Sequence, residues 1–207
     1  RERLRRLLAG ADRVIAGAED VPARLRHHGM QGAFVTMPHE DPEPTPPARR
    51  AAPAPGGRLR VALFGAISDI KGFHRLIDCA RHVARVGLPL DFVVFGHTMD
   101  DAQAEATGRI RVTGRYREED LADRVALHRP HLAFFPNQCP ETYSYTLSHS
   151  FRLGLWPVAT DIGAPAERIG RAGFGTLIPL EARAPEICRT LMEAAAGGPG
   201  EAGAVTR

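Results

Sequence analysis

Short apolar runs recur along residues 58–196, and a segment with helical spacing separates most of them from the next. The runs are rich in β-prone residues and cover 61–64, 92–95, 110–112, 132–135, 158–159 and 177–178. The helical segments cover about 71–86, 118–128, 144–153, 164–171 and 183–196; only the link at 99–108 shows no clear pattern. Strands that are apolar on both faces and joined by helices form a parallel sheet with both sides covered. The sequence therefore predicts a doubly wound, Rossmann-like α/β fold.

Three further segments flank this unit. Residues 1–39 show the pattern helix, strand, helix, strand, and we expect them to pack on the unit as interdomain elements. Residues 40–57 hold six prolines and a glycine pair. Because proline disrupts both helices and strand ladders, this segment is predicted to be an extended linker. Residues 197–207 are glycine-rich with little to bury, which predicts a flexible tail.

Charge argues against one class of partner. The chain has 27 Lys and Arg against 24 Asp and Glu, a net charge of +3. That surplus is too small to indicate a nucleic-acid-binding surface, and it does not oppose an anionic ligand. The pair His128 and His131 has a proline between its members and no acidic or thiol companion, so we expect neither a metal nor any other cofactor.

Cysteine usage and hydropathy bear on location. Cys79, Cys139 and Cys188 are far apart in the sequence, which predicts buried free thiols in a reducing compartment. No apolar run approaches the roughly 20 residues that span a bilayer. We therefore expect a cytoplasmic protein. The sequence begins with Arg1, so targeting signals or membrane association of a longer protein would not be visible.

The first candidate site is the turn that follows the run at 61–64. In open parallel sheets, ligands bind beyond the carboxyl ends of the strands. Gly65 allows close backbone approach, a helix begins near Lys71, and the lysine adds positive charge, which together suit a diphosphate. The turn matches neither the dinucleotide fingerprint nor the P-loop. Taken alone, it also fits a plain strand–turn–helix with Lys71 in solvent.

The second candidate follows the run at 132–135. Glu141 is predicted to stand in the loop, with a helix opening at Thr142 or Tyr143. The amides of Ser144, Tyr145 and Thr146 would then lie at the positive end of the helix dipole, where anions bind. The alternative is that Glu141 and Thr142 only cap the helix.

These residues carry a resemblance. The stretch Pro-Glu-Thr-Tyr-Ser-Tyr-Thr-Leu-Ser at 140–148, followed by Gly-Leu-Trp-Pro-Val-Ala-Thr-Asp-Ile-Gly-Ala-Pro-Ala-Glu-Arg-Ile at 154–169, closely resembles the C-terminal domain of retaining GT-B glycosyltransferases, family 4 or group 1. The Lys-Gly turn at 71–72, the segment 112–116 and the segment 13–20 also match, in the same order. The resemblance covers about residues 10–40 and 58–180.

The resemblance implies a role for each candidate. Glu141 matches the first acidic residue of the family's Glu-x7-Glu motif, which approaches the donor sugar, and it is the catalytic candidate. Lys71 resembles the residue that binds the donor diphosphate. The other implied donor-binding positions are Gly65 in the turn, Arg115 and Tyr116 beside the nucleobase, Ser144, Tyr145 and Thr146 at the helix start, His149 near the ribose and Glu167 in a loop lining the cleft.

Two positions depart from the family pattern. Ala66 stands where arginine commonly pairs with the lysine, and His149 stands where the second glutamate binds the ribose hydroxyls. A neutral imidazole accepts only one hydrogen bond, whereas a carboxylate accepts from both hydroxyls. We therefore expect His149 to face the cleft, not the core, and to bind the donor more weakly than glutamate does.

The resulting hypothesis is a bacterial enzyme of polysaccharide or cell-envelope biosynthesis. This domain would bind a nucleoside-diphosphate sugar, and a missing N-terminal domain would bind the acceptor. The chain alone is then expected to bind nucleotide weakly and to transfer no sugar. Two alternatives stay open: a non-catalytic nucleotide-sugar-binding module, and a sugar-nucleotide epimerase with the same two-domain fold.

Overall fold

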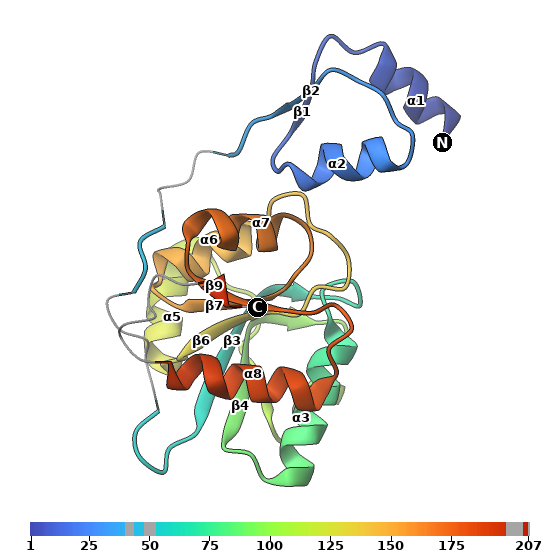
Figure 1. Ribbon diagram of the computed structural model, residues 1–207. Coiled ribbons are helices and arrows are strands. Elements are labelled where there is room, and N and C mark those ends of the chain that lie inside the picture. Colours follow the sequence, from blue (N-terminus) through green and yellow to red (C-terminus); the bar gives the residue numbers. More distant parts are fainter. Residues whose placement is uncertain (40–43, 48–52, 198–204, 207) are drawn as a thin grey trace.

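The main body of the protein is a single parallel sheet with helices on both faces. The computed structural model describes residues 1–39, 44–47, 53–197 and 205–206 (Figure 1). The strands are β3 (Leu59–Ile67), β4 (Leu90–Thr98), β5 (Ile110–Val112), β6 (Leu132–Phe135), β7 (Trp156–Thr160), β8 (Gly175–Ile178) and β9 (Val205–Thr206). Their order is β5-β4-β3-β6-β7-β8-β9, and all pairs are parallel. The first six follow the Rossmann order, whose direction reverses between β3 and β6.

Two apolar cores, one on each side of the sheet, hold the helices in place. The helices are α3 (Phe73–Val86), α4 (Asp101–Ala106), α5 (Leu121–His128), α6 (Tyr145–Arg152), α7 (Gly163–Ala172) and α8 (Ala184–Ala196). On β3, Val61 and Leu63 join the core under α3 and α8, whereas Ala62 and Phe64 join the core under α5 and α6 (Figure 1). Both faces of each central strand are therefore buried, which confirms the predicted fold class.

The six predicted strands are all present. The link that showed no helical pattern contains α4, which is short and begins at a side-chain cap: the Asp100 carboxylate accepts the Gln103 N–H at 2.8 Å. β9 was not predicted; its two residues belong to the segment expected to be a flexible tail, but their backbone pairs with β8. Residues 198–204 and 207 of that segment lie outside the described residues.

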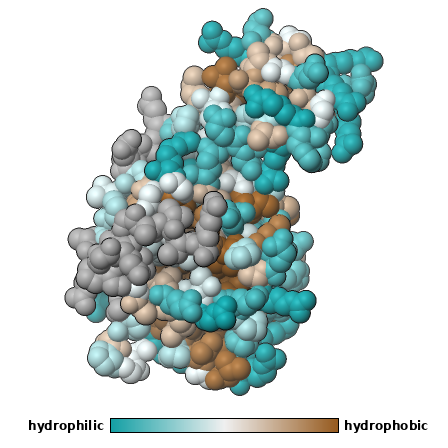
Figure 2. All heavy atoms as spheres, viewed as in Figure 1, coloured by the Kyte–Doolittle hydropathy of each residue, from teal (hydrophilic) through white to brown (hydrophobic). Residues whose placement is uncertain are grey.

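The N-terminal residues form a small lobe. It contains α1 (Glu2–Ala9), β1 (Val14–Ala16), α2 (Asp20–His27) and β2 (Phe34–Thr36), and its two strands pair in parallel, apart from the main sheet. α2 contacts α7, and in the view of Figures 1 and 2 the lobe stands above the main body. Of the predicted linker, 44–47 and 53–57 are described and contain neither helix nor strand; 40–43 and 48–52 lie outside the described residues.

The start of β6 depends on a neutral histidine. The Nδ1 atom of buried His131 accepts the backbone N–H of Arg60 at 2.9 Å. Burial lowers the pKa of His131. As the pH falls below about 6.5, His131 therefore takes up a proton in the unfolded chain before it does so in the folded chain. The free energy of unfolding decreases until the pH reaches the folded-state pKa of His131.

We expect the free energy of unfolding to be lower at pH 5.5 than at pH 7.5, and His131→Asn to reduce that difference. Asparagine keeps an acceptor near the position of Nδ1 but does not titrate in this range. Urea unfolding at both pH values measures the effect. Burial also lowers the pKa of His128, so the variant should keep part of the pH dependence of its free energy of unfolding. An equal pH dependence in the variant and the parent would contradict the role of His131.

Candidate functional site

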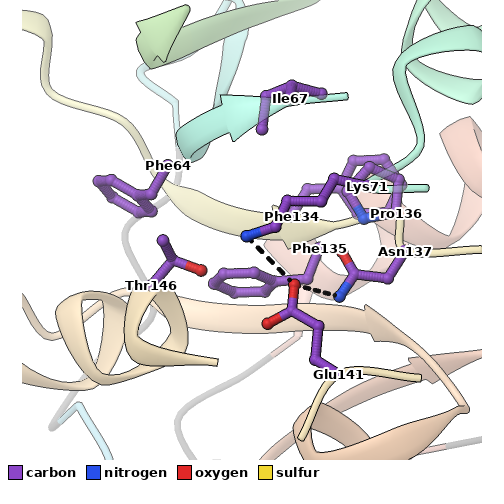
Figure 3. Close-up of a pocket in the computed structure, with 9 residues that line it drawn as sticks. All are labelled: Phe64, Ile67, Lys71, Phe134, Phe135, Pro136, Asn137, Glu141 and Thr146. Carbon is purple, nitrogen blue, oxygen red and sulfur yellow. Dashed lines mark hydrogen bonds and ion pairs between the residues drawn. The ribbon is translucent and has the colours of Figure 1, made fainter. Parts of the chain in front are cut away.

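The two predicted loops meet at the carboxyl edge of the sheet, where β3 and β6 are neighbours. Lys71 Nζ lies 3.3 Å from Glu141 Oε1, and Asn137 Nδ2 donates to the same oxygen at 2.8 Å (Figure 3). These three side chains line a small pocket together with Phe64, Ile67, Phe134, Phe135, Pro136 and Thr146. The structure therefore brings the two candidate loops together around one pocket.

Backbone contacts hold the two loops together. The Gln138 N–H donates to the Ile70 carbonyl at 2.9 Å. Gly72 has φ +87° and lies so close to Pro136 that a Cβ would fall 2.1 Å from the Pro136 carbonyl oxygen. Only glycine combines this left-handed conformation with so close an approach. The position of Lys71 therefore depends on its glycine neighbour.

We expect Gly72→Ala to destabilise the protein well beyond the cost of a left-handed alanine, which is about 1–2 kcal/mol. The matched control is Gly87→Ala at the other end of α3, where φ is +72° and nothing lies within 4 Å of the added Cβ. The collision with Pro136 should add about 1–3 kcal/mol. Urea unfolding measures both variants, and equal losses would show that the close contact carries no energy.

The start of α6 is unusual. Ser144 adopts a left-handed conformation with φ 72° and ψ 80°, and the helix begins only at Tyr145. The predicted start at Thr142 or Tyr143 is wrong, because a left-handed residue cannot continue into a right-handed helix. Strained residues of this kind often mark functional sites. A Cβ on Gly65 would lie 3.2 Å from Thr146 Cγ2, so the first turn of α6 faces the Gly65 turn.

Arg168 of α7 holds this turn, a role that no pattern in the sequence predicted. Its Nη1 donates to the carbonyls of Tyr143 (3.2 Å) and Ser144 (2.8 Å), and its Nη2 donates to Ser148 Oγ (2.9 Å). The guanidinium also lies 4.1 Å from the centroid of the Tyr143 ring. Its only sequence signal is its place beside Glu167 in the matching motif.

His149 lies elsewhere than expected. The residue is only 7% exposed, and the centroid of its ring lies 6.3 Å from the ring centroids of both Phe64 and Tyr116. Nδ1 is 3.0 Å from Arg152 Nη2, and Nε2 is 3.9 Å from Glu118 Oε1. The expectation that His149 is not a core histidine is wrong, because α6 packs closely over the end of β3 and buries residues 147–150.

The nucleobase candidates lie near His149. Tyr116 is half-buried, and burial raises the pKa of its phenol. Its neighbour Arg115 is exposed. The structure thus brings the expected base and ribose positions together, while their contact with a nucleotide stays a prediction.

Two other predicted residues lie at the junction with the N-terminal lobe. Glu167 is in α7, not in a loop: its carboxylate accepts the Asp20 N–H at 3.1 Å and pairs with Arg171 at 2.7 Å. Tyr145 is 62% exposed, and its ring lies 5.3 Å from that of His39. Glu167 therefore joins the lobe to α7 and is not among the groups around Lys71; its donor-binding role stays a prediction.

The described residues give no metal cluster and no helix long and apolar enough to cross a membrane. All three cysteines are free; Cys79 and Cys188 are buried as predicted, but Cys139 is exposed, because it lies in the loop that follows β6. The site thus offers one cation, one carboxylate and a helix N-terminus, an arrangement suited to a diphosphate with an attached polar group.

Comparison with known proteins identifies the family of this chain. The family model described as "Glycosyl transferases group 1" matches residues 58–194. The chain belongs to this glycosyltransferase family. Comparison with curated protein sequences gave no match.

Solved glycosyltransferase structures share the fold. Anabaena HepE in complex with UDP is 16% identical, with a TM-score of 0.65 over 90% of this chain and 54% of that one. The galactosyltransferase WaaB of the lipopolysaccharide outer core is 13% identical, with a TM-score of 0.67 over 93% and 56%. Sucrose-phosphate synthase from Thermosynechococcus elongatus is 17% identical, with a TM-score of 0.65 over 96% and 54%. This chain therefore spans about half the length of these structures and corresponds to the C-terminal domain of a GT-B glycosyltransferase.

Proposed function

We propose that this domain binds the nucleoside-diphosphate sugar donor of a glycosyltransferase that retains the anomeric configuration. The observation that carries the proposal is the Lys71–Glu141 pair beside the first turn of α6, at the carboxyl edge of the sheet where the strand order reverses. Support also comes from HepE, which was solved with UDP and with UDP-glucose.

The chemistry follows from the charges. When the bond between the sugar C1 and the diphosphate oxygen breaks, negative charge develops on the diphosphate. Lys71 and the amides of Tyr145 and Thr146 would stabilise that charge electrostatically. The Glu141 carboxylate, anchored by Asn137, would position the sugar. A second domain would bind the acceptor and exclude water by closing over the site. A cytoplasmic bacterial enzyme acting on a polysaccharide or cell-envelope acceptor is part of the same proposal.

A non-catalytic module that binds nucleotide sugars is the second candidate. The burial of His149 favours it, because this ring takes the place of a ribose-binding glutamate and contacts Arg152 and Glu118 instead. Donor affinity would then come from the diphosphate contacts alone. Both candidates require a nucleotide to bind at Lys71, so a nucleotide-binding experiment tests both. Sugar transfer by the protein with its acceptor domain would distinguish the enzyme from the non-catalytic module.

The experiment uses the fact that Lys71 is the only lysine in the sequence. In the 207-residue chain, an amine-acylating reagent should modify Lys71 and the amino-terminal amine carried by Arg1, which peptide mapping distinguishes. UDP, GDP or dTDP should slow acylation of Lys71 and leave that of Arg1 unchanged. The same nucleotide should raise the unfolding temperature, since it binds only the folded state. If none of the three nucleotides protects Lys71, the proposal is wrong.

A further inference from the structure

A second hollow lies at the opposite, amino-terminal end of the sheet. It has a volume of about 480 Å³ and is formed by the first residues of β3, β4 and β5 and the last residues of α5. Its charged and titratable lining residues are Arg58, Arg60, Asp91, Arg109, Arg111 and His128. That volume lies within the range of small-molecule sites. None of these residues takes part in the site around Lys71.

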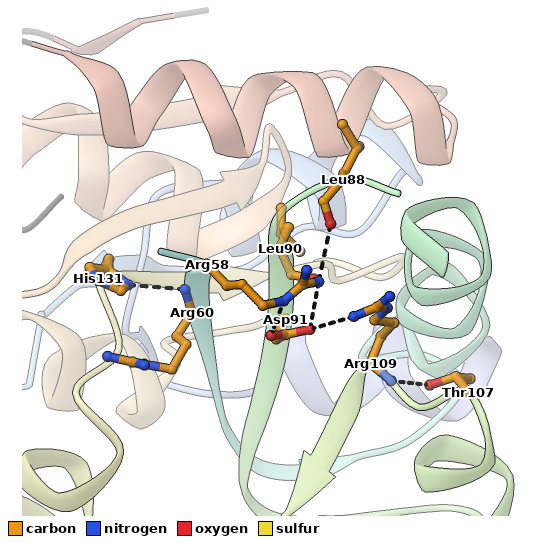
Figure 4. A network of polar contacts seen from close by, with 8 residues as sticks. All are labelled: Arg58, Arg60, Leu88, Leu90, Asp91, Thr107, Arg109 and His131. Atoms are coloured by element: carbon orange, nitrogen blue, oxygen red, sulfur yellow. Dashed lines mark hydrogen bonds and ion pairs between the residues drawn. The ribbon is translucent and has the colours of Figure 1, made fainter. Parts of the chain in front are cut away.

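One carboxylate fixes two of the four arginines (Figure 4). Arg58 binds both oxygens of Asp91, with Nη2 2.9 Å from Oδ1, and also donates to the carbonyls of Leu88 and Leu90. Arg109 Nη1 lies 3.6 Å from the same Oδ1. The two guanidinium groups are thus held at the wall of the hollow before any ligand arrives, which lowers the entropy cost of binding.

The other two arginines leave positive charge uncompensated. Arg60 Nε donates to the Arg129 carbonyl at 3.1 Å, and Arg111 is exposed on β5. Within the described part of the chain, neither forms an ion pair with a carboxylate. Among the described residues that line the hollow, Asp91 is therefore the one carboxylate beside four arginines.

The field of these arginines reaches the neighbouring histidine. The pKa of His128 is lowered by burial first, and then by the charges of Arg111 and Arg60. His131, on the other side of Arg60, accepts that residue's backbone N–H. His128 consequently reports on the charge inside the hollow.

We propose that this hollow is a second anion-binding site, which takes the phosphoryl group of a small phosphorylated ligand. Guanidinium groups bind phosphate oxygens in pairs, and here four arginines line one cavity on a rigid sheet edge. A free phosphorylated metabolite and a phospholipid headgroup offer the same chemistry. Exposed Leu127 on the rim is an apolar contact that either source can use.

The test uses inorganic pyrophosphate as the probe, in a Lys71→Gln background so that the first site competes less for it. Histidine ring resonances are followed by NMR during the titration. We expect saturable shifts of the His128 signals and a higher measured pKa for that ring, because a bound anion favours its protonated form. Arg111→Gln should weaken pyrophosphate binding by about tenfold or more, since a charge-assisted fork is lost.

The controls separate this site from general electrostatics. Arg189→Gln on α8 removes the same charge from an exposed surface elsewhere and should leave the affinity unchanged. Arg111→Lys keeps the charge without the fork and should be intermediate. If His128 does not respond to pyrophosphate, or if Arg189→Gln and Arg111→Gln weaken binding equally, the site does not exist. Neither result bears on the Lys71 site.

A vesicle titration distinguishes the two sources. Phosphatidylglycerol vesicles that displace pyrophosphate from His128, where phosphatidylcholine vesicles do not, would identify a lipid headgroup as the ligand. Pyrophosphate binding without displacement by either vesicle would identify a soluble phosphorylated ligand. Both results support the anion site.

Discussion

Replacing Lys71 with glutamine is expected to weaken the binding of a nucleoside diphosphate, with UDP as the probe, by about 10- to 100-fold. A hydrogen bond between charged partners contributes about 1.5–3 kcal/mol, and tenfold in affinity is about 1.4 kcal/mol. The unfolding free energy should hardly change, because Lys71 is 32% exposed and its ion pair with Glu141 lies near the surface. Calorimetry with UDP and urea unfolding measure the two effects. Arg81→Gln, an exposed position on α3, is the charge-matched control.

Glu141→Gln should act in the opposite direction on nucleotide binding. In the free protein the carboxylate pairs with Lys71, and an incoming diphosphate must compete with it and tolerate its negative charge. Glutamine keeps the size and the contact with Asn137 but removes both obstacles, so UDP should bind as well or several-fold more tightly. Sugar transfer by the protein with its acceptor domain should be lost. Weaker UDP binding in Glu141→Gln would place the carboxylate in direct contact with the nucleotide.

The fold was predictable because its signal is local. Each central strand is buried on both faces, so the run at 61–64 is continuously apolar. Such a strand can be predicted without knowing which strands lie beside it. The link at 99–108 gave little signal because α4 has only six residues and depends on the Asp100 cap. β9 could not be predicted, because it is a two-residue strand that forms only by pairing with β8.

The site was predictable only in part. Gly65, Lys71 and Glu141 follow their strands directly, so the sheet edge itself brings them together. The burial of His149 depends on where α6 begins, and that depends on Ser144 and on a contact from α7. The position of Glu167 depends on the N-terminal lobe, 147 residues away along the chain. Contacts of this kind produce no periodic pattern of residues from which they could be predicted.

Arg168→Met is expected to lower both stability and nucleotide affinity. It removes the charged hydrogen bonds to Tyr143, Ser144 and Ser148 and the contact with the Tyr143 ring, and it leaves the carbonyls of Tyr143 and Ser144 without this partner. We expect a loss of about 2–4 kcal/mol in the free energy of unfolding. Without Arg168 the strained Ser144 should relax toward an ordinary conformation, so that the first amides of α6 turn away from the diphosphate. UDP affinity should fall by about tenfold.

Two variants separate these effects. Arg171→Met lies one turn along α7 and removes only an exposed ion pair with Glu167, so it should cost less than about 1 kcal/mol and leave UDP binding unchanged. Arg168→Lys keeps the charge but cannot reach three acceptors as a fork, and it should restore stability and affinity only in part. Hydrogen exchange at the Leu147 amide, which donates to the Ser144 carbonyl, reports directly on the first turn of α6. Faster exchange there with unaltered UDP affinity would mean that Arg168 supports the fold alone and that the shape of this turn does not govern binding.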